Sequence, residues 1–551
     1  MSRTLTPDST LDGLKKEAKR WLKALRDGDA KARERLVAAA PAAPAFPGLR
    51  DVQLALAREY GLPGWTAIRE ALDDLALARR SRAELVEIVL RSAWQGDPAA
   101  AARILARSPE IRADNFYIAV ATGDFEAVKR RLAADPVAAT RKGGPFNWEP
   151  LLYLAYARLA GDESRAVDIA RLLLDHGADP NARFTDDWDN PFTVLTGVIG
   201  EGEGDRPPHP QASALAELLI DRGANPFDTQ ALYNTSITRD DTTWLEFLWS
   251  QSEKLGLTQN WRAIAEKLGG QVPLGVLDYL LGNAVAYNHL KRAEWLIGHG
   301  ANPNGVHAYS NRPLREEALI YGHVAMADLL VRHGAATLPL NGQAAFQAAC
   351  MRLDRDTART IADRHPDCLR NPAPMLTAAR QGRTDVVELL LKLGMDVDVA
   401  DEIEQRGLQV AVAGGSLEVV KLLVAHGADI DRPTTSFGGG AMGYAAHFDR
   451  REIAAFLAPL SHDVHELTYL GMKERLRELL AEDPSLANAR HPRASVTPLF
   501  CLPDDEDDAA EMAELLLAYD ANPAAMNNGE TAEQAARKRG LIDAADLMQQ
   551  R

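Results

Sequence analysis

A short phrase recurs along this chain and constrains its fold more than any other feature. Each copy is a leucine-rich stretch that ends in Gly-Ala or a close variant, usually followed by an acidic or amide residue. A repeat at a fixed period indicates stacked supersecondary units rather than one globular core. Such proteins act through an extended surface, so a single catalytic cleft is not the first expectation. The copies are LLLDHGADPN (172–181), LLIDRGANPF (218–227), WLIGHGANPN (295–304), LLVRHGAATL (329–338), LLLKLGMDVD (389–398), LLVAHGADID (422–431) and LLLAYDANPA (515–524).

The most regular copy predicts what each unit looks like. It reads RGLQVAVAGGSLEVVKLLVAHGADID over residues 406–431, and Gly414-Gly415 divides it into two short helices. Gly427 stands just past the second helix, where a left-handed residue ends a helix without steric cost. The following acidic residue can bond its own backbone and start a turn. The apolar face of the second helix is formed by Leu417, Val420, Leu423 and Val424.

The period and the unit together resemble the ankyrin-repeat family. Gly300 and Gly334 are 34 residues apart, and Gly394 and Gly427 are 33 apart, which matches the family's turn plus two helices of about 33 residues. The family's Gly-His break occurs once intact, as Gly322-His323. Its T-P-L-H tetrapeptide survives in degraded form as Thr497-Pro498-Leu499-Phe500, Arg312-Pro313-Leu314-Arg315, Glu149-Pro150-Leu151-Leu152 and Thr193-Val194-Leu195-Thr196.

The resemblance implies an all-α fold: an elongated ankyrin-repeat solenoid with an N-terminal helical cap. Regular and degraded units together amount to roughly 13 between residues 82 and 551. The degraded units are 82–113, 114–143, 231–270, 341–370 and 464–490. The last helix, over 531–551, is polar on one side, as a terminal cap requires.

Residues 1–80 do not follow the repeat and form a separate helical module. An amphipathic helix is predicted to start at Ser9 or Thr10, and two further helices are broken at Gly61–Gly64. The proline-containing stretch 39–48 is a linker or turn. The module is similar to those that precede bacterial ankyrin arrays. The basic face of its first helix can bind an acidic surface, or it can simply keep a capping helix soluble.

The charge and composition of the chain limit the kinds of partner that it can bind. The chain has 62 Lys+Arg and 78 Asp+Glu, a net charge of −16. An acidic solenoid repels phosphate backbones, so we expect no nucleic-acid partner and a protein partner with a neutral or basic surface. No apolar run of about 18 residues and no secretory signal occurs, so no membrane segment is predicted. Three widely spaced cysteines form no disulfide framework, which favours a cytoplasmic location.

Two irregular stretches interrupt the array, and insertions in repeat proteins map to loops on the binding face. The first is residues 183–213, where Gly177 and Gly223 are 46 residues apart. The second is residues 227–305, a degenerate double unit rich in tryptophan. Six of the nine tryptophans fall between residues 148 and 295. Aromatic side chains near carboxylates are typical of recognition hot spots, so the 148–310 segment is the predicted binding region.

By the family resemblance, the finger and first-helix positions of the array face a concave groove. Trp188 is expected to be exposed, because Asp187 and Asp189 flank it. Tyr153 and Tyr156 stand at helical spacing and fit a core position equally well. The predicted groove residues are Trp148, Tyr153, Tyr156, Trp188, Tyr233, His307 and Tyr309, with the polar loop residues Asp186, Asp187, Asp189, Glu201, Glu203 and His209 beside them.

The sequence motifs give little support for nucleotide binding, calcium binding or a histidine-based metal site. GEGEGD (200–205) superficially resembles a phosphate loop, but its carboxylates repel phosphate and no Gly-Lys-Ser/Thr occurs. DDWDNP (186–191) lacks the glycine and closing glutamate of a calcium loop. His462 and His465 are three residues apart, but they stand where one unit ends and the next begins. We therefore expect no bound metal and no cofactor, and we assign no catalytic residue.

Two function hypotheses remain. The leading one is a protein–protein interaction scaffold that binds its partner through the concave face of the array. The alternative is an enzyme or small-molecule-binding protein that uses the acidic and aromatic loops of 183–213 as a polar pocket, with paired carboxylates for general acid–base chemistry. A closed polar cavity beside Trp148 and Tyr233 favours the second hypothesis. A purely structural spacer would carry no patch of exposed aromatics.

Overall fold

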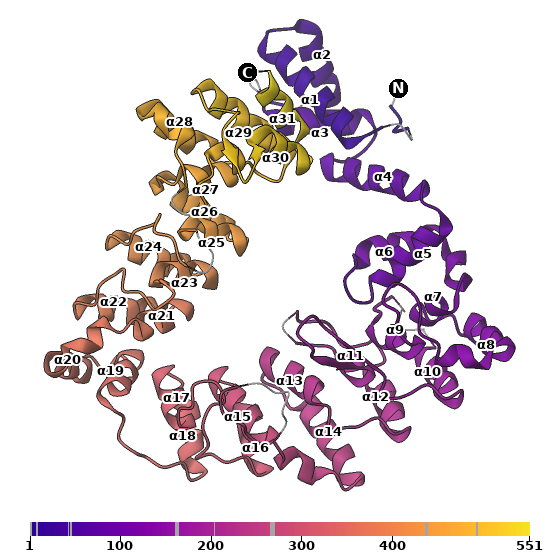
Figure 1. The fold of residues 1–551 in the computed structure, drawn as a ribbon, viewed down its shortest axis with the longest axis vertical. Coiled ribbons are helices and arrows are strands. Elements are labelled where there is room, and N and C mark those ends of the chain that lie inside the picture. The colour runs from indigo at the N-terminus through magenta and orange to yellow at the C-terminus, as the bar shows by residue number, and fades with distance from the viewer. Residues whose placement is uncertain are drawn as a thin grey trace. The chain divides into compact units, whose positions relative to one another are not determined.

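The structure is a computed structural model that describes residues 3–6, 9–41, 43–44, 47–159, 165–202, 204–264, 270–435, 439–491 and 494–550. The fold is an all-α solenoid of helical repeats with two short two-stranded ribbons (Figure 1). The chain divides into two compact units. Unit 1 comprises residues 1–302 and 308–311, and unit 2 comprises residues 303–307 and 312–551.

Four helices at the start of unit 1 share a small core of their own. Thr10 caps the first of them by accepting a hydrogen bond from the Gly13 N–H, which confirms one of the two predicted start positions. The Trp21 indole N–H donates to the Ala32 carbonyl at 3.0 Å and so fixes the second helix against the first. The predicted break at Gly61–Gly64 is also confirmed. The helices are α1 (Leu11–Arg26), α2 (Ala30–Ala39), α3 (Leu49–Glu59) and α4 (Trp65–Ala78).

The rest of unit 1 is built from helix pairs. The first helices of successive pairs, α7 to α15 in odd numbers, pack against one another, and the second helices α8, α10 and α12 form a parallel layer (Figure 1). The pairs are α5 (Arg82–Arg91) with α6 (Pro98–Arg107), α7 (Phe116–Ala121) with α8 (Phe125–Ala134), α9 (Pro150–Tyr156) with α10 (Ala166–Asp175), α11 (Val194–Ile199) with α12 (Ala212–Asp221), α13 (Thr229–Thr238) with α14 (Thr243–Lys254), and α15 (Val276–Ala286) with α16 (Leu290–Gly298). The strands β1 (Arg183–Thr185) and β2 (Pro191–Thr193) stand between α10 and α11.

Unit 2 repeats the same arrangement. Its first helices contact one another in order from α17 to α27, and its second helices do so from α22 to α26. The break at Gly415 is left-handed, with φ +77°, and Gly427 has φ +87°, as predicted for helix ends. The pairs are α17 (Leu314–Ile320) with α18 (Val324–Arg332), α19 (Gly342–Met351) with α20 (Arg355–Arg364), α21 (Ala373–Arg380) with α22 (Thr384–Lys392), α23 (Gly407–Gly414) with α24 (Leu417–Ala425), α25 (Ala441–His447) with α26 (Arg451–Leu457), and α27 (Val464–Tyr469) with α28 (Lys473–Glu482).

The C-terminal end of unit 2 differs from the expectation. The single last helix predicted for 531–551 is two helices, α30 (Ala532–Lys538) and α31 (Ile542–Gln549), because Gly540 has φ +80° and ends the first of them. A short ribbon, β3 (Met526–Asn527) with β4 (Glu530–Thr531), precedes α30. Before α29 (Glu506–Ala518), the degraded tetrapeptide at 497–500 forms only a 3-10 turn, η7 (Pro498–Phe500). Among the described residues, no helix has both the length and the apolarity needed to cross a membrane.

Residues of the recurring phrase form hydrogen bonds between neighbouring repeats. The Asn181 side-chain amide donates to the Gly223 carbonyl at 2.8 Å, and its side-chain oxygen accepts from the Asn225 N–H at 2.9 Å. Asn304 makes the same pair of bonds to Gly334 and Ala336, one repeat further on. Where the phrase ends in asparagine, at positions 181 and 304, that side chain therefore links its turn to the turn of the next repeat.

Removing one of these asparagine side chains is expected to destabilise the array locally. Asn181→Ala deletes two inter-repeat hydrogen bonds, and we expect the free energy of unfolding of unit 1 to fall by about 1–2 kcal/mol. Denaturant unfolding followed by circular dichroism measures this change. Asn181→Asp, which keeps the acceptor but loses the donor, is expected to fall between the wild type and Asn181→Ala. An unchanged midpoint for Asn181→Ala would contradict the assigned role.

Candidate functional site

The insertion after α10 folds into an antiparallel ribbon, with Phe184 opposite Phe192. Its tip is organised by Asp186, whose Oδ1 accepts from the N–H of Trp188 at 3.0 Å and from the N–H of Asn190 at 2.8 Å. Its Oδ2 accepts from the Asn190 side-chain amide at 3.0 Å. Because the tip is closed by Asp186, the Trp188 side chain projects outward and is 86% exposed. The predicted exposure of Trp188 is confirmed.

A cluster of aromatic rings packs against the two strands of the ribbon. Phe184 stacks on Trp148 with ring centroids 4.3 Å apart, and on Phe192 at 5.4 Å. Trp94, in the turn between α5 and α6, meets Phe184 and Phe192 edge-on at 4.9 and 5.0 Å. Tyr156 also contacts Trp94, at 5.6 Å. Such rings bury large areas and fix one another's orientation, so the ribbon is held rigidly.

Two arginines hold the second part of the insertion, residues 200–211. The Arg206 guanidinium donates to the carbonyls of Ala93 at 2.6 Å and Trp94 at 3.1 Å. Arg158 donates to the Gly197 carbonyl at 2.7 Å and the Pro207 carbonyl at 2.8 Å. Burial lowers the pKa of Arg158 to about 10, and the neighbouring charge of Arg206 acts in the same direction. Carbonyl oxygens therefore take the place of carboxylate partners for these two cations.

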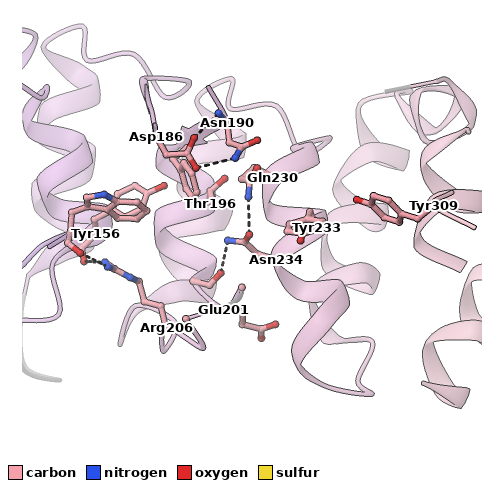
Figure 2. A pocket seen from close by; sticks show the side chains of 15 residues that line it. Tyr156, Asp186, Asn190, Thr196, Glu201, Arg206, Gln230, Tyr233, Asn234 and Tyr309 are labelled. Atoms are coloured by element: carbon pink, nitrogen blue, oxygen red, sulfur yellow. Dashed lines mark hydrogen bonds between the residues drawn. The ribbon is translucent and has the colours of Figure 1, made fainter. Parts of the chain in front are cut away.

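The ribbon, residues 200–202 and 204–206, and α13 line a half-open cavity of about 400 Å³ in unit 1. Figure 2 shows Asp186 and Asn190 at one edge of the cavity, Arg206 at another, and Gln230, Tyr233 and Asn234 projecting from α13. Tyr309 lies at the far side of the same view. The lining also includes Trp94, Tyr156, Phe192, Thr196, Gly200, Glu201, Gly202 and Gly204.

Several polar groups of this cavity are bonded to one another. Gln230 donates through Nε2 to the Asn234 side-chain oxygen at 3.0 Å, and Asn234 donates to the Gly200 carbonyl at 3.3 Å. Thr238 donates to Glu201 Oε2 at 3.1 Å. Burial raises the pKa of the Glu201 carboxyl above its usual range. These polar groups of the lining are thus engaged in internal hydrogen bonds.

The structure separates the residues that the sequence placed in one groove. Tyr156, Asp186, Glu201, Tyr233 and Tyr309 line the cavity. Trp148 and Tyr153 are buried in the aromatic cluster and support the ribbon instead. Asp187 and Asp189 are exposed at the tip beside Trp188. Glu203 lies outside the described residues.

The two predicted histidines lie elsewhere. His209 is only 3% exposed, and its Nδ1 accepts a hydrogen bond from the Gln211 N–H at 3.0 Å. His307 belongs to unit 2, where its Nδ1 is 3.6 Å from a carboxylate oxygen of the buried Glu317. Neither histidine lines the cavity. In the part of the chain that the structure describes, no group of three or more His, Cys, Asp and Glu residues is arranged to hold a metal ion.

Sequence reasoning missed Trp94, Arg158, Arg206, Gln230 and Asn234. Trp94 stands in a degraded repeat far from the insertion, and the partners of both arginines are backbone carbonyls, which leave no sequence pattern. Gln230 and Asn234 are four residues apart on α13, so helical spacing alone places them on one face. That spacing was the only available signal.

Comparison with known proteins identifies the repeats. A family model described as ankyrin repeats in three copies matches residues 375–467, and a single ankyrin-repeat model matches residues 149–184. The chain is an ankyrin-repeat protein. The second match covers α9, α10 and the first two residues of β1, so part of the candidate site of this ankyrin-repeat protein belongs to a recognisable repeat.

Two curated relatives are similar over short stretches of this ankyrin-repeat protein. Ankyrin repeat and KH domain-containing protein mask-1 of Caenorhabditis elegans is 36% identical over 80 residues, which are 14% of this chain and 3% of that protein. Ankyrin repeat and SAM domain-containing protein 6 of Danio rerio is 31% identical over 122 residues, 20% of this chain and 16% of that protein. The chain thus covers only a small part of either relative.

Two solved structures also resemble part of the ankyrin-repeat protein. One is an ankyrin repeat domain from Acinetobacter baumannii, 22% identical, with a TM-score of 0.26. The other comes from the complex of a predatory endopeptidase of Bdellovibrio bacteriovorus with an immunity protein, 22% identical, with a TM-score of 0.25. Each match covers 32% of this chain and 97% of the other.

Proposed function

We propose that this ankyrin-repeat protein is an interaction scaffold that binds a protein partner on the concave face of its array, around the ribbon tip and the unit-1 cavity. Ankyrin repeats are in general protein–protein interaction modules. The observation that carries the more specific proposal is the exposed Trp188. Isolated large apolar side chains on a surface need no explanation, but this one is raised on a rigid ribbon beside a cavity lined by aromatic and polar groups.

The charge around the tip indicates what kind of segment fits there. Asp187 and Asp189 flank Trp188, and Asp186 borders the cavity behind it. The whole chain carries a net charge of −16. A partner segment with an apolar side chain next to Lys or Arg would complement this surface, and long-range attraction would speed its association. The proposal includes a cytoplasmic location, where the free thiols of Cys350, Cys368 and Cys501 would stay reduced.

Trp188→Ala is the direct test. We expect partners captured from source lysate by the wild type to be lost from the variant. A purified partner should bind about thirtyfold more weakly or worse, because tryptophan truncations in hot spots cost about 2 kcal/mol or more. Leu255→Ala is the matched control, since Leu255 is 52% exposed in unit 1 but remote from the ribbon in sequence. Asp187→Ala is expected to weaken binding less and to reduce its dependence on salt.

Three outcomes of the capture experiment can be distinguished. A partner that is retained by Leu255→Ala and lost by Trp188→Ala supports the proposal. A partner that survives both changes places the interface elsewhere on the array. If neither the wild type nor the control captures any protein above background, the scaffold proposal fails.

The cavity supports a second candidate function. Its volume of about 400 Å³ lies within the range of small-molecule sites, about 300–1,000 Å³. Its polar side chains suit a small polar ligand. The expected readout is a compound that raises the melting temperature of the wild type but not of Gln230→Leu, which removes a cavity amide. A compound that stabilises both proteins equally would not be bound in this cavity.

A further inference from the structure

Unit 2 contains a cavity that the proposed function does not use. It has a volume of about 770 Å³ and lies among α25, α27 and the segment around 494–501. Ala446, Val496 and Phe500 supply apolar wall, and Tyr469 adds a second aromatic ring. The lining also carries one carboxyl group, that of Glu466. A mostly apolar cavity with a single acid is suited to a ligand that has an apolar body and one cationic end.

Glu466 is placed in this cavity by its helix and by two glycines. Asp463 caps α27 and accepts the N–H groups of His465 and Glu466. The Glu466 side chain then lies against α25 at Gly443, where an added methyl group would come within 2.5 Å of Oε1. An added methyl group at Gly439 would come equally close. Side chains larger than glycine at these two positions would therefore displace the carboxyl group.

Among the described residues, no hydrogen bond joins the half-buried carboxyl group of Glu466 to another side chain or to the backbone. The basic side chains Arg539 and His465 are engaged with other groups. Arg539 donates to the Leu502 carbonyl at 2.8 Å and to Asp504 at 2.7 Å. The Nε2 of His465 lies 3.1 Å from the carbonyls of both Ala489 and Val496. Toward the residues that the structure describes, the acceptor capacity of Glu466 is therefore unused.

The surroundings of Glu466 also control its charge. Burial raises its pKa to about 7, the carboxylates of Asp463 and Asp431 add to the rise, and His465 opposes it. Tyr469 and Cys501 face the same space, and burial raises the pKa of both. His447, His491 and Arg539 complete the titratable lining. A cationic ligand would therefore meet an ionised Glu466 above about pH 7 and a neutral one below it.

We propose that this cavity binds an organic ammonium compound with an aromatic body, its ammonium group paired with Glu466 and its ring against Tyr469 and Phe500. An ion pair formed away from bulk water is strengthened when its donors are satisfied, and aromatic faces attract ammonium groups. The ring and the short carbon chain would bury against the apolar wall.

The probe is 2-phenylethylammonium, titrated into the full chain by calorimetry or ligand-observed NMR. We expect it to bind about tenfold more tightly than the neutral 2-phenylethanol. Its affinity should rise about tenfold between about pH 6 and about pH 8, as the ionised fraction of Glu466 rises. The anion phenylacetate is expected to bind more weakly than either.

Two variants test the assignment by different routes. Glu466→Gln removes the charge while keeping the shape, and should abolish both the preference for the ammonium compound and the rise with pH. Gly443→Ala keeps the charge but displaces the carboxyl group, and should weaken binding about tenfold. Glu478→Gln, at an exposed glutamate of α28, is the matched control and should bind like the wild type.

Three results would overturn the proposal. They are absence of binding to the wild type at millimolar probe, equal affinity of the wild type and Glu466→Gln, or tighter binding of phenylacetate than of the ammonium compound. Thermal unfolding of each variant in the absence of probe shows whether lost binding reflects a lost fold. If Glu466→Gln does not fold, Gly443→Ala and the pH profile of the wild type decide the question.

Discussion

Trp261→Ala is expected to lower the free energy of unfolding of unit 1 by about 3–5 kcal/mol, the usual cost of truncating a buried tryptophan. Trp261 lies in the 3-10 turn η3 (Thr258–Arg262) and is fully buried. Its ring meets Trp249 at 5.3 Å, Phe227 at 6.1 Å and Trp295 at 6.3 Å. Its indole N–H donates to the buried Ser252 hydroxyl at 3.0 Å. The substitution therefore opens a cavity and leaves a buried hydroxyl without this partner.

Denaturant unfolding, together with hydrogen exchange of α14 to α16, measures the effect. Trp188→Ala is the matched control, because the same substitution at an 86% exposed position should change stability by no more than about 0.5 kcal/mol. Trp261→Phe should recover part of the loss, since it keeps most of the ring but not the N–H donor. Equal stability of Trp261→Ala and Trp188→Ala would show that the buried position of Trp261 is wrong.

The second large effect is a loss of stability in acid that depends on His209. Burial lowers the pKa of His209 to about 4, and the charge of Arg158 contributes. Its Nδ1 accepts the Gln211 N–H, which a protonated Nδ1 cannot do. Because the folded pKa lies below the ordinary 6.5, the stabilisation is complete above pH 6.5 and is lost as pH falls towards 4. The loss amounts to about 3 kcal/mol over that range.

Stability measured at intervals across this range tests the expectation. Carboxylates also titrate there, so the informative quantity is the difference between the wild type and His209→Asn. The asparagine oxygen can accept the Gln211 N–H but does not titrate. We expect the difference to shift by about 2–3 kcal/mol in favour of the variant between pH 7 and the acid end. Parallel curves for the two proteins would mean that His209 titrates normally.

The sequence predicted the repeat fold well because its signals are local. The left-handed glycines Gly415 and Gly427, the helix start at Thr10 and the break at Gly61–Gly64 all follow from backbone preferences of single residues. The last helix was predicted wrongly for a related reason. Gly540 reads as a tolerated glycine within a helical pattern, and only its φ of +80° shows that it ends α30.

The candidate site was predicted only in part because its contacts are not local. The exposure of Trp188 could be read from its acidic neighbours, but Trp148 and Tyr153 could not be told from groove residues by spacing. Phe184 stacks on Trp148, Tyr153 packs against Trp148 in turn, and the ribbon is fixed by Trp94 from a degraded repeat. Arg206 reaches over more than a hundred residues to the carbonyl of Ala93. Long-range contacts of this kind leave no periodic pattern in the sequence.

The ribbon separates the residues that hold it from the residues that it displays. Phe184 and Phe192 anchor it below, and Asp186 closes its turn from within. The side chains of Asp187 and Trp188 are exposed and take no part in that support, although the Trp188 N–H donates to Asp186. Under the proposed function, substitutions of these exposed side chains would therefore change recognition without affecting folding. The same property makes these positions suitable for randomised libraries in which new specificities are selected on an unchanged scaffold.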